Sequence, residues 1–328
     1  MDRTSANLPR HQTQSSTGHY ESWFQRGNHP SRPLAFWIRY TIFHPRGGTP
    51  VGELWGIWFD GETNQIFAAK QTWPWARCRF GSAALDITIG ESRLRDGELS
   101  GHAQGGGNML EWSLQYAGGQ EPLLLLAEPL YSAPLPRAKV LVGTPGARYS
   151  GSFVVNGTAH AIEQWPGSQN HNWGSKHTDR YAWGQVAGFD EAPDAFLECA
   201  TAKLRFGPLW TPWLTSVVLR LDGQQYAINS IIRAARAKAS IEHFDWQFQA
   251  HDEKAEIHCR MHAPRARFVG LTYGNPPGGT KTCLNTKLAS CELTLTRRGQ
   301  PPRQLHSAHR AAFEILTDDV DHGVPIVA

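Results

Sequence analysis

The stretch FDWQFQAHDEKAEIHCRM, residues 244–261, carries the pattern that decides the fold. Two runs within it, residues 244–248 and 257–261, place an apolar side chain at every second position, with polar residues between them. An apolar period of two is typical of a β-strand with one face in the core and the other in water. We therefore predict two half-buried strands here.

The same alternation recurs elsewhere in the chain, in residues 85–89, 112–116 and 291–295. Four dipeptides typical of two-residue hairpin turns stand between strand-like runs, since such turns need the positive φ that Gly, Asn and Asp tolerate. They are Asp60-Gly61, Asp96-Gly97, Asn156-Gly157 and Asp222-Gly223. Together these signals predict an antiparallel meander.

Helical patterns are scarce, and the best candidate is the short alanine-rich segment 231–240. The chain shows no glycine-rich phosphate loop and no alternation of strands with helices, which argues against a doubly wound nucleotide-binding fold. The predicted fold class is all-β with few short helices.

A proline-rich passage, residues 129–145, is expected to interrupt the sheets, because proline lacks the N–H group that a strand ladder needs. We place a domain boundary there. The expected organisation is a mobile segment 1–18, a β domain 19–140 and a second β domain 148–328. Each half holds enough short strands for a closed or nearly closed barrel with a cavity.

The composition narrows the class of protein. The 328 residues are 40% hydrophobic and 19% charged, with a net charge of +3, too mild to indicate a nucleic-acid partner. The longest apolar run, Leu123–Ala127, is far short of the roughly 20 residues that a membrane span needs. The first residues lack the apolar core of a signal peptide, so we expect a cytoplasmic chain. Its five cysteines, with no CxxC pair, are expected to be reduced and mostly buried.

Residues 167–189 hold the densest set of candidate site residues. The polar part, 168–176, is expected to be a loop that carries Asn170, His171, Asn172 and Trp173. A strand with an aromatic inward face should follow it and close a barrel mouth. The further candidates in this segment are His177, Asp179, Tyr181 and Trp183. The alternative is structural: the asparagines satisfy turn backbones and Trp173 packs a barrel end.

A second cluster lies near the N-terminus, where charges stand among aromatic residues. It consists of Glu21, Trp23, Arg39, Glu53 and Trp55. A buried charge is costly unless it is paired. These charges therefore either anchor a ligand in an apolar cavity, or pair as Arg39–Glu53 or Arg39–Glu21, or face outward.

Glu198, in the run FLECA, falls on the strand after the aromatic one. A buried carboxyl there would have the raised pKa that a general acid needs, whereas an exposed strand carboxylate would have no such role. No HExxH motif or Cys/His box occurs, so we expect no metal site.

Four short motifs resemble one family. They are YESWF at 20–24, QNHNWG at 169–174, YAWGQ at 181–185 and FLE at 196–198. They resemble the AttH-like lipocalin-type proteins, a group related to hydroxyneurosporene synthase (carotenoid 1,2-hydratase), tocopherol cyclase and the lipocalin-like Diels–Alderases. The resemblance runs from about residue 18 to the end. It implies two consecutive lipocalin-like (calycin-like) antiparallel β-barrels, a hydrophobic ligand of isoprenoid or polyketide type, and chemistry without a cofactor.

One position departs from the relatives. Asn170 stands where they commonly carry Asp, and an amide cannot donate a proton as an acid does. If that acid matters in the relatives, its role passes here to Asp179, Glu198 or Glu53.

Three hypotheses follow. The first is a hydratase, cyclase or isomerase whose catalytic residues are Glu53, His171, Asp179 and Glu198. The second is a non-catalytic carrier or sensor of a lipid-like molecule in the same cavity. The third is a structural protein with filled barrels and no cavity. The oligomeric state is left open. The expected ligand-binding residues are Glu21, Trp23, Arg39, Trp55, Asn170, Asn172, Trp173, His177, Tyr181 and Trp183.

Overall fold

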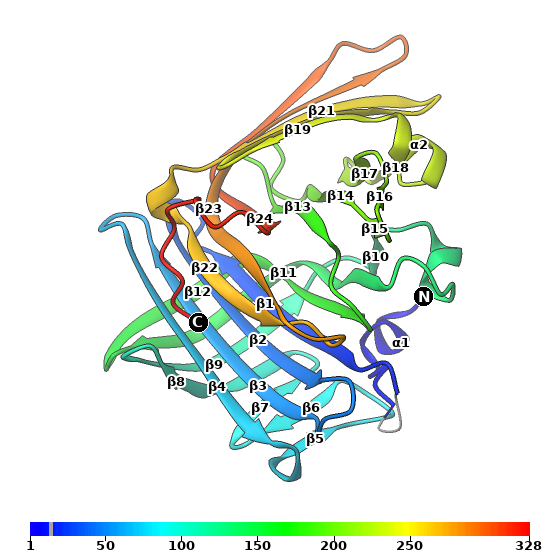
Figure 1. Cartoon of the computed structure of the whole chain (residues 1–328). Helices are drawn as coiled ribbons and strands as arrows, with labels where there is room; N and C mark the ends of the chain where they lie inside the picture. Colours follow the sequence, from blue (N-terminus) through cyan, green and yellow to red (C-terminus); the bar gives the residue numbers. More distant parts are fainter. Residues whose placement is uncertain (13–15) are drawn as a thin grey trace.

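The structure is a computed structural model that describes residues 1–12 and 16–328. Two large antiparallel sheets follow one another along the chain (Figure 1). Sheet A is a nearly closed barrel of twelve strands, with the order β4-β3-β2-β1-β12-β11-β9-β8-β7-β6-β5, and β10 pairs with β11. Sheet B has ten strands, with the order β18-β17-β14-β13-β24-β23-β21-β20-β19, and β22 pairs with β23. The all-β prediction is confirmed.

The strands of sheet A are β1 (His19–Asn28), β2 (Leu34–His44), β3 (Val51–Asp60), β4 (Gln65–Pro74), β5 (Cys78–Phe80), β6 (Asp86–Ile89), β7 (Ser92–Arg95), β8 (Glu98–Gly105), β9 (Asn108–Gly118), β10 (Leu123–Leu124), β11 (Ala138–Val155) and β12 (Thr158–Gly174).

The strands of sheet B are β13 (Arg180–Ala187), β14 (Phe196–Lys203), β17 (Leu214–Leu221), β18 (Gln224–Ile228), β19 (Lys238–Glu242), β20 (Asp245–His251), β21 (Ala255–His262), β22 (Val269–Gly274), β23 (Thr280–Arg297) and β24 (Arg303–Thr317). A small hairpin joins β15 (Arg205–Phe206) to β16 (Leu209–Trp210). The helical segments of the described chain are α1 (Arg3–Asn7), α2 (Ile231–Arg236), η1 (Trp75–Arg77), η2 (Glu128–Tyr131) and η3 (Arg265–Arg267).

The four hairpin signals each lie between paired strands. Asn156-Gly157 and Asp222-Gly223 have positive φ at both positions, as a two-residue turn of this kind requires. Asp96-Gly97 also forms a two-residue connection, between β7 and β8. At Asp60-Gly61 the loop is longer, because the last pair of β3 and β4 is Asp60 with Gln65.

The loop expected at residues 168–176 is wrong for most of its length. Residues 168–174 form the end of β12, which pairs with both β1 and β11. Most of their polar side chains are buried and hydrogen-bonded within the protein instead of solvated. Gln169 donates to Asn7, for example, and Asn170 accepts from Gln185. The polar sequence of residues 168–174, which lacks an apolar period of two, therefore belongs to a buried strand and not to a loop. The expected helix at 231–240 is present but ends at Arg236.

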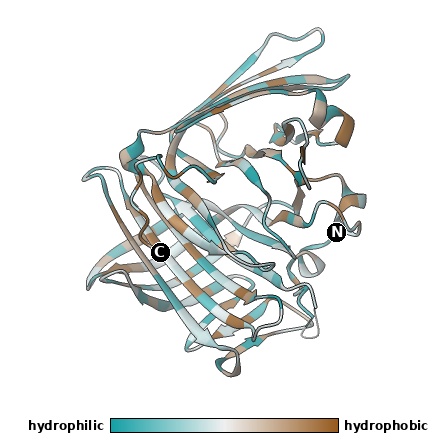
Figure 2. Ribbon diagram, viewed as in Figure 1, coloured by the Kyte–Doolittle hydropathy of each residue, from teal (hydrophilic) through white to brown (hydrophobic). Residues whose placement is uncertain are grey.

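Aromatic side chains fill the interior of sheet A. Trp23, Trp58, Trp112 and Trp165 belong to one buried cluster with aliphatic residues of the same sheet. The opposite face of sheet A packs against sheet B through a separate cluster that includes Trp37 and Trp183. Figure 2 shows hydrophobic and hydrophilic segments alternating along the strands, as such two-faced packing requires. The space between the two sheets is therefore where an internal site is to be sought.

The change of sheet falls between Gly174 and Arg180, after the β11–β12 hairpin. The domain boundary predicted at residues 140–148 would separate two units that fold independently. The change of sheet does not test this, so the boundary stays a prediction. Residues 13–15 of the segment expected to be mobile lie outside the described residues. The rest of that segment contacts sheet A, since α1 packs near β11, and its mobility also stays a prediction.

Two further expectations can be compared with the structure. All five cysteines are free, and four of them are buried, as expected. Neither α-helix within residues 1–12 and 16–328 has the length or apolar character needed to cross a membrane.

Candidate functional site

A cavity of about 360 Å³ lies between the two sheets. Sheet A contributes side chains from β1, β2, β11 and β12, and sheet B contributes side chains from β13, β14, β17, β22 and β24. The size falls within the usual range for small-molecule sites. A structural protein with filled barrels predicts no such cavity, so the cavity counts against the third hypothesis.

One part of the cavity wall is apolar and opens to solvent. It is formed by Leu125, Leu130, Leu135, Leu204, Phe206, Leu214 and Ile231. Leu135, Phe206 and Ile231 are 46%, 48% and 61% exposed, so the mouth lies beside them. Lys139 also lines this part; its ammonium group donates to the backbone carbonyls of Ala133 and Pro136, and burial lowers its pKa. An apolar molecule would therefore meet apolar side chains from the mouth inward.

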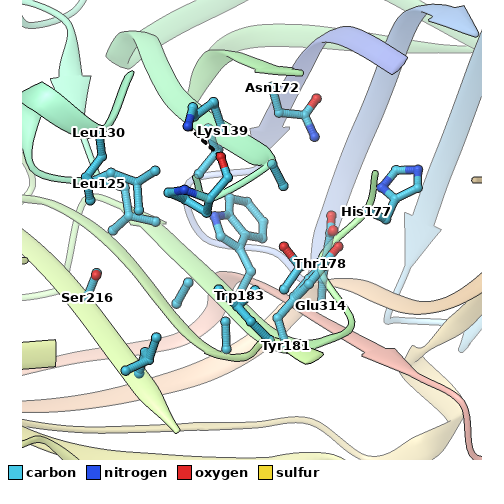
Figure 3. A pocket seen from close by; sticks show the side chains of 18 of the residues that line it. Leu125, Leu130, Lys139, Asn172, His177, Thr178, Tyr181, Trp183, Ser216 and Glu314 are labelled. Atoms are coloured by element: carbon cyan, nitrogen blue, oxygen red, sulfur yellow. Dashed lines mark hydrogen bonds between the residues drawn. The ribbon is translucent and has the colours of Figure 1, made fainter. Parts of the chain in front are cut away.

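Trp183 stands in the wall between the apolar part and His177 (Figure 3). Its Nε1–H donates to Glu198 Oε1 at 2.8 Å, and Gln185 donates to Glu198 Oε2 at 2.7 Å. Glu198 itself is fully buried and is not among the lining residues. Burial raises its pKa to about 8, against the opposing effect of these hydrogen bonds and of Arg26. Burial therefore favours the neutral form of this carboxyl group, which lies one side chain behind the cavity.

Glu314 of β24 lines the cavity directly. Its Oε1 accepts hydrogen bonds from Lys287 at 2.8 Å and Asn285 at 2.9 Å, and the Cys283 thiol lies 3.6 Å from its Oε2. Burial lowers the pKa of Lys287, and the neighbouring Glu314 opposes that effect. This group was not expected from the sequence.

A polar cluster occupies the inner part of the cavity around Arg39. The His177 ring stacks on Tyr20 with centroids 3.9 Å apart and on Tyr273 at 5.7 Å. Its Nε2 lies 3.1 Å from the Gly274 carbonyl oxygen, which only accepts, so Nε2 carries the proton and Nδ1 a lone pair. Burial, followed by the charge of Arg39, lowers the pKa of His177 to about 3. His177 is therefore neutral at physiological pH.

Glu21 and His171 form a buried pair at another place, beneath the N-terminal segment. His171 Nε2 lies 2.8 Å from Glu21 Oε1, and its Nδ1 lies 2.7 Å from the Ala6 carbonyl oxygen. The backbone N–H groups of Arg10 and His11 also donate to Glu21. Burial raises the pKa of Glu21, but hydrogen bonds from His171 and His19 outweigh it and lower the value to about 2. This pair holds the N-terminal segment against sheet A.

The remaining candidates are hydrogen-bonded or packed outside the cavity wall. Glu53 accepts from Trp55 at 3.2 Å and pairs with Lys70 at 3.0 Å. Asp179 pairs with Lys176 and accepts from the Arg205 backbone. Trp23 stacks on His171, and Trp173 lies beside the same ring. Asn170 accepts from Gln185.

The structure thus brings five of the expected site residues together on the cavity wall. They are Arg39, Asn172, His177, Tyr181 and Trp183. Sequence reasoning missed Glu314 and Lys287. The signal that singled out Glu198, a charge inside an apolar strand run, is present at Glu314 in AAFEIL, whereas Lys287 follows two polar residues in CLNTKLA. Among the described residues, no three His, Cys, Asp or Glu side chains are grouped so that they could hold a metal ion.

Two relatives from Mycobacterium tuberculosis align with almost the whole chain. They are the uncharacterized proteins Rv0493c, from strain H37Rv, and MT0513, from strain CDC 1551. Each is 27% identical over 304 residues, which is 90% of this chain and 86% of the relative.

Solved structures share the fold at low sequence identity. An AttH protein (NE1406) from Nitrosomonas europaea has a TM-score of 0.58 at 12% identity, over 90% of this chain and 92% of that one. Kievitone hydratase from Nectria haematococca has a TM-score of 0.55 at 11% identity, over 97% and 96%. CghA, solved with Sch210972, has a TM-score of 0.58 at 8% identity, over 96% and 93%. These likenesses confirm the lipocalin-like fold.

The sequence of residues 131–315 matches the family described as tocopherol cyclase-like. This match spans more than half of the chain, from the proline-rich passage through β24, and it includes Lys139, Trp183 and Glu314 of the cavity wall. The resemblance inferred from the short motifs is therefore confirmed, and the chain belongs to the tocopherol cyclase-like family.

Proposed function

We propose that the chain is a hydratase- or cyclase-type enzyme that transfers a proton to an apolar small molecule held between the two sheets. The observation that carries this proposal is the carboxyl group of Glu314 on the wall of a largely apolar, aromatic cavity. Membership of the tocopherol cyclase-like family and the likeness to kievitone hydratase support the same class of reaction. An isoprenoid- or polyketide-like alkene would suit the apolar wall.

Glu314 is the proposed general acid. It would donate its proton to one carbon of an alkene and leave a carbocation at the other. Lys287 and Asn285 donate to its Oε1 and so stabilise the carboxylate that remains. The faces of Trp37 and Trp183, which line the cavity, would stabilise the cation.

The second step decides the product. Attack by water on the cation gives an alcohol, whereas attack by a hydroxyl group of the same molecule gives a ring. In both cases the attacking oxygen loses a proton, which returns to Glu314, so that atoms and charges balance. Exclusion of bulk water by the apolar wall would favour the ring.

Glu198 is proposed as a positioning residue, because its carboxyl group holds Trp183 and Gln185 in place. The other acids and the histidine expected from the sequence, Glu53, Asp179 and His171, stay proposals. Each has protein partners, and none is among the lining residues.

The test compares Glu314→Gln with Glu292→Gln, an exposed glutamate at the far part of β23. Prenylated phenols and linear isoprenoid alkenes would be incubated with each protein and analysed by liquid chromatography and mass spectrometry. Hydration adds the mass of one water, and cyclisation changes retention without a change in mass. We expect Glu314→Gln to lower turnover by about 10²–10⁴-fold and Glu292→Gln to leave it unchanged.

Unchanged turnover in Glu314→Gln would contradict the assignment of this acid. The carrier hypothesis predicts a different result: the probe molecules shift the fluorescence of Trp37 and Trp183, but no product forms with the wild-type protein. Fluorescence and product formation are therefore measured on the same samples.

A further inference from the structure

Arg39 is a buried cation for which the protein supplies no counter-charge. Its residue is 4% exposed and lines the cavity. Among the described residues no carboxylate pairs with it, and its Nε has no hydrogen-bond partner. The guanidinium group lies over the Tyr273 ring, 4.5 Å from the centroid, and 5.9 Å from that of Trp37. Ring faces offset only part of the cost of burying a charge.

Arg26 and Lys287, which are completely buried, differ from Arg39 in having hydrogen-bond partners within the protein. Arg26 donates through Nε to the Gln185 side chain and through Nη2 to its backbone carbonyl oxygen. Lys287 pairs with Glu314 and donates to Asn285. Both are satisfied within the protein. Of these three cations only Arg39 of β2 lines the cavity. Lys139, another buried cation of the wall, donates to two backbone carbonyl oxygens, whereas no such partner is seen among the described residues for the Arg39 Nε atom.

The groups around Arg39 suit an oxyanion. Trp37 Nε1 is also buried without a partner, and Trp37 lines the cavity. Tyr20 and Tyr273 line the same part of the wall, and burial raises the pKa of both hydroxyl groups. They therefore stay protonated and able to donate a hydrogen bond. His177 beside them is neutral, so it adds no second charge.

The rest of the wall suits the remainder of the ligand. In Figure 3, Leu125 and Leu130 lie on one side of Trp183, together with Lys139 and Ser216, and His177 lies on the other side. The leucines and His177 therefore stand at different ends of the wall. The ligand that matches this division has an anionic oxygen group at one end and an apolar body that extends toward the mouth beside Leu135 and Phe206.

We propose that Arg39 is the anion-binding group of this cavity and that its ligand is an apolar molecule bearing a carboxylate. This inference rests on the proposed function, because it concerns the same cavity. Arginine binds a carboxylate through two parallel N–H···O hydrogen bonds, and burial from water strengthens such a pair. Anchoring the acid end at Arg39 would leave the apolar body beside Trp183 and Glu314.

The experiment measures binding of decanoic acid and of decan-1-ol, which differ at the head group, by tryptophan fluorescence. The proteins are the wild type, Arg39→Met, Arg39→Lys and Arg32→Met. Arg32 is the matched control, because it precedes β2 and makes an exposed ion pair with Glu62. We expect the wild type to bind the acid at least tenfold more tightly than the alcohol. Arg39→Met should lose this preference while keeping its affinity for the alcohol.

Arg39→Lys should retain part of the preference, since it keeps the charge but not the two-pronged geometry. Arg32→Met should behave as the wild type does. Thermal unfolding distinguishes an anion-binding arginine from one that only stabilises the fold. Arg39→Met should unfold at the same or a higher temperature without ligand, and decanoate should raise the unfolding temperature of the wild type but not of Arg39→Met.

Three results would overturn the inference. If both probes bind and Arg39→Met keeps the wild-type preference, the anion site is wrong, while the cavity stands as a ligand site. If neither probe binds to the wild type, this inference fails together with the proposed function. A lower unfolding temperature of Arg39→Met with no change in preference would assign Arg39 a structural role and would also contradict the inference.

Discussion

Single charged residues inside strands supply the candidate chemical groups in and behind the cavity of this protein. Glu198 is the clearest case, because the sequence left open a buried acid or an exposed strand carboxylate, and the structure places the side chain in full burial behind Trp183. The same criterion also applies to Glu314 and Lys287. These two were missed because a charge in a strand is equally compatible with an exposed side chain. Only the packing of β23 and β24 against sheet A shows that both are buried.

The raised pKa of Glu198 predicts how stability depends on pH. The folded protein holds this proton up to about pH 8, whereas an ordinary glutamate releases it near 4.5. The contribution of the neutral carboxyl is therefore complete below about pH 4.5 and is lost as the pH rises toward 8. Relative to Glu198→Gln, the wild type should lose up to about 1.4 kcal/mol of unfolding free energy per pH unit in this window.

Urea unfolding of both proteins at several pH values between about 5 and 8 measures the difference. If the unfolding free energies of the two proteins changed with pH in parallel, the result would contradict a raised pKa of Glu198. We also expect Glu198→Gln to have a lower unfolding free energy by a constant amount at every pH. Its amide NH₂ group would face the N–H donor of Trp183 or Gln185, and two donors cannot hydrogen-bond to each other.

At the scale of elements, turns were easier to predict than polar strands. Asn156-Gly157 and Asp222-Gly223 form the expected turns because local backbone conformation alone decides them. The segment 168–174 was misread as a loop. Its polar side chains are satisfied by residues far away in the sequence, such as Asn7 and Glu21, and no local pattern reveals such partners.

The pairing of β1 with β12 predicts a large effect at one glycine. A Cβ atom on Gly167 would lie 1.9 Å from the Arg26 backbone oxygen, closer than any real contact. Gly157→Ala is the comparison, because this turn glycine has open space around it but a φ of +85°. We expect Gly157→Ala to cost about 1–2 kcal/mol of unfolding free energy and Gly167→Ala clearly more.

Denaturant unfolding of the two variants measures which one loses more unfolding free energy. Equal losses in Gly157→Ala and Gly167→Ala would mean that β1 and β12 separate easily at Gly167. The close approach of the two strands at Gly167 would then contribute little to the stability of the barrel.

At the scale of the whole molecule, the cavity results from the way the two sheets meet. It is lined from both sheets, so its ligand would bridge them. Ala200 of β14 lines the cavity, whereas Ala250 of β20 is buried in the core of sheet B. We predict that Ala200→Phe fills the cavity, abolishes binding of decan-1-ol and leaves the unfolding temperature nearly unchanged.

Ala250→Phe is the matched substitution in a packed core and should cost about 1–3 kcal/mol. Fluorescence titration and thermal unfolding of both variants make the comparison. Normal ligand binding by Ala200→Phe would show that the ligand site lies elsewhere.

The sequence by itself determined most of the strands and turns, the family, and some charged residues within strand patterns, such as Glu198. These properties follow from local rules: alternation assigns each side chain to a face, and φ preferences place the turns. The tertiary structure alone decided which faces meet. Glu21 and His171 came to lie beneath the N-terminal segment, while Arg39, His177, Trp183 and Glu314 came to share one cavity. The physical reason is that strand pairing and sheet packing join residues far apart in sequence, whereas a period of two says only which side chains share a face of a strand.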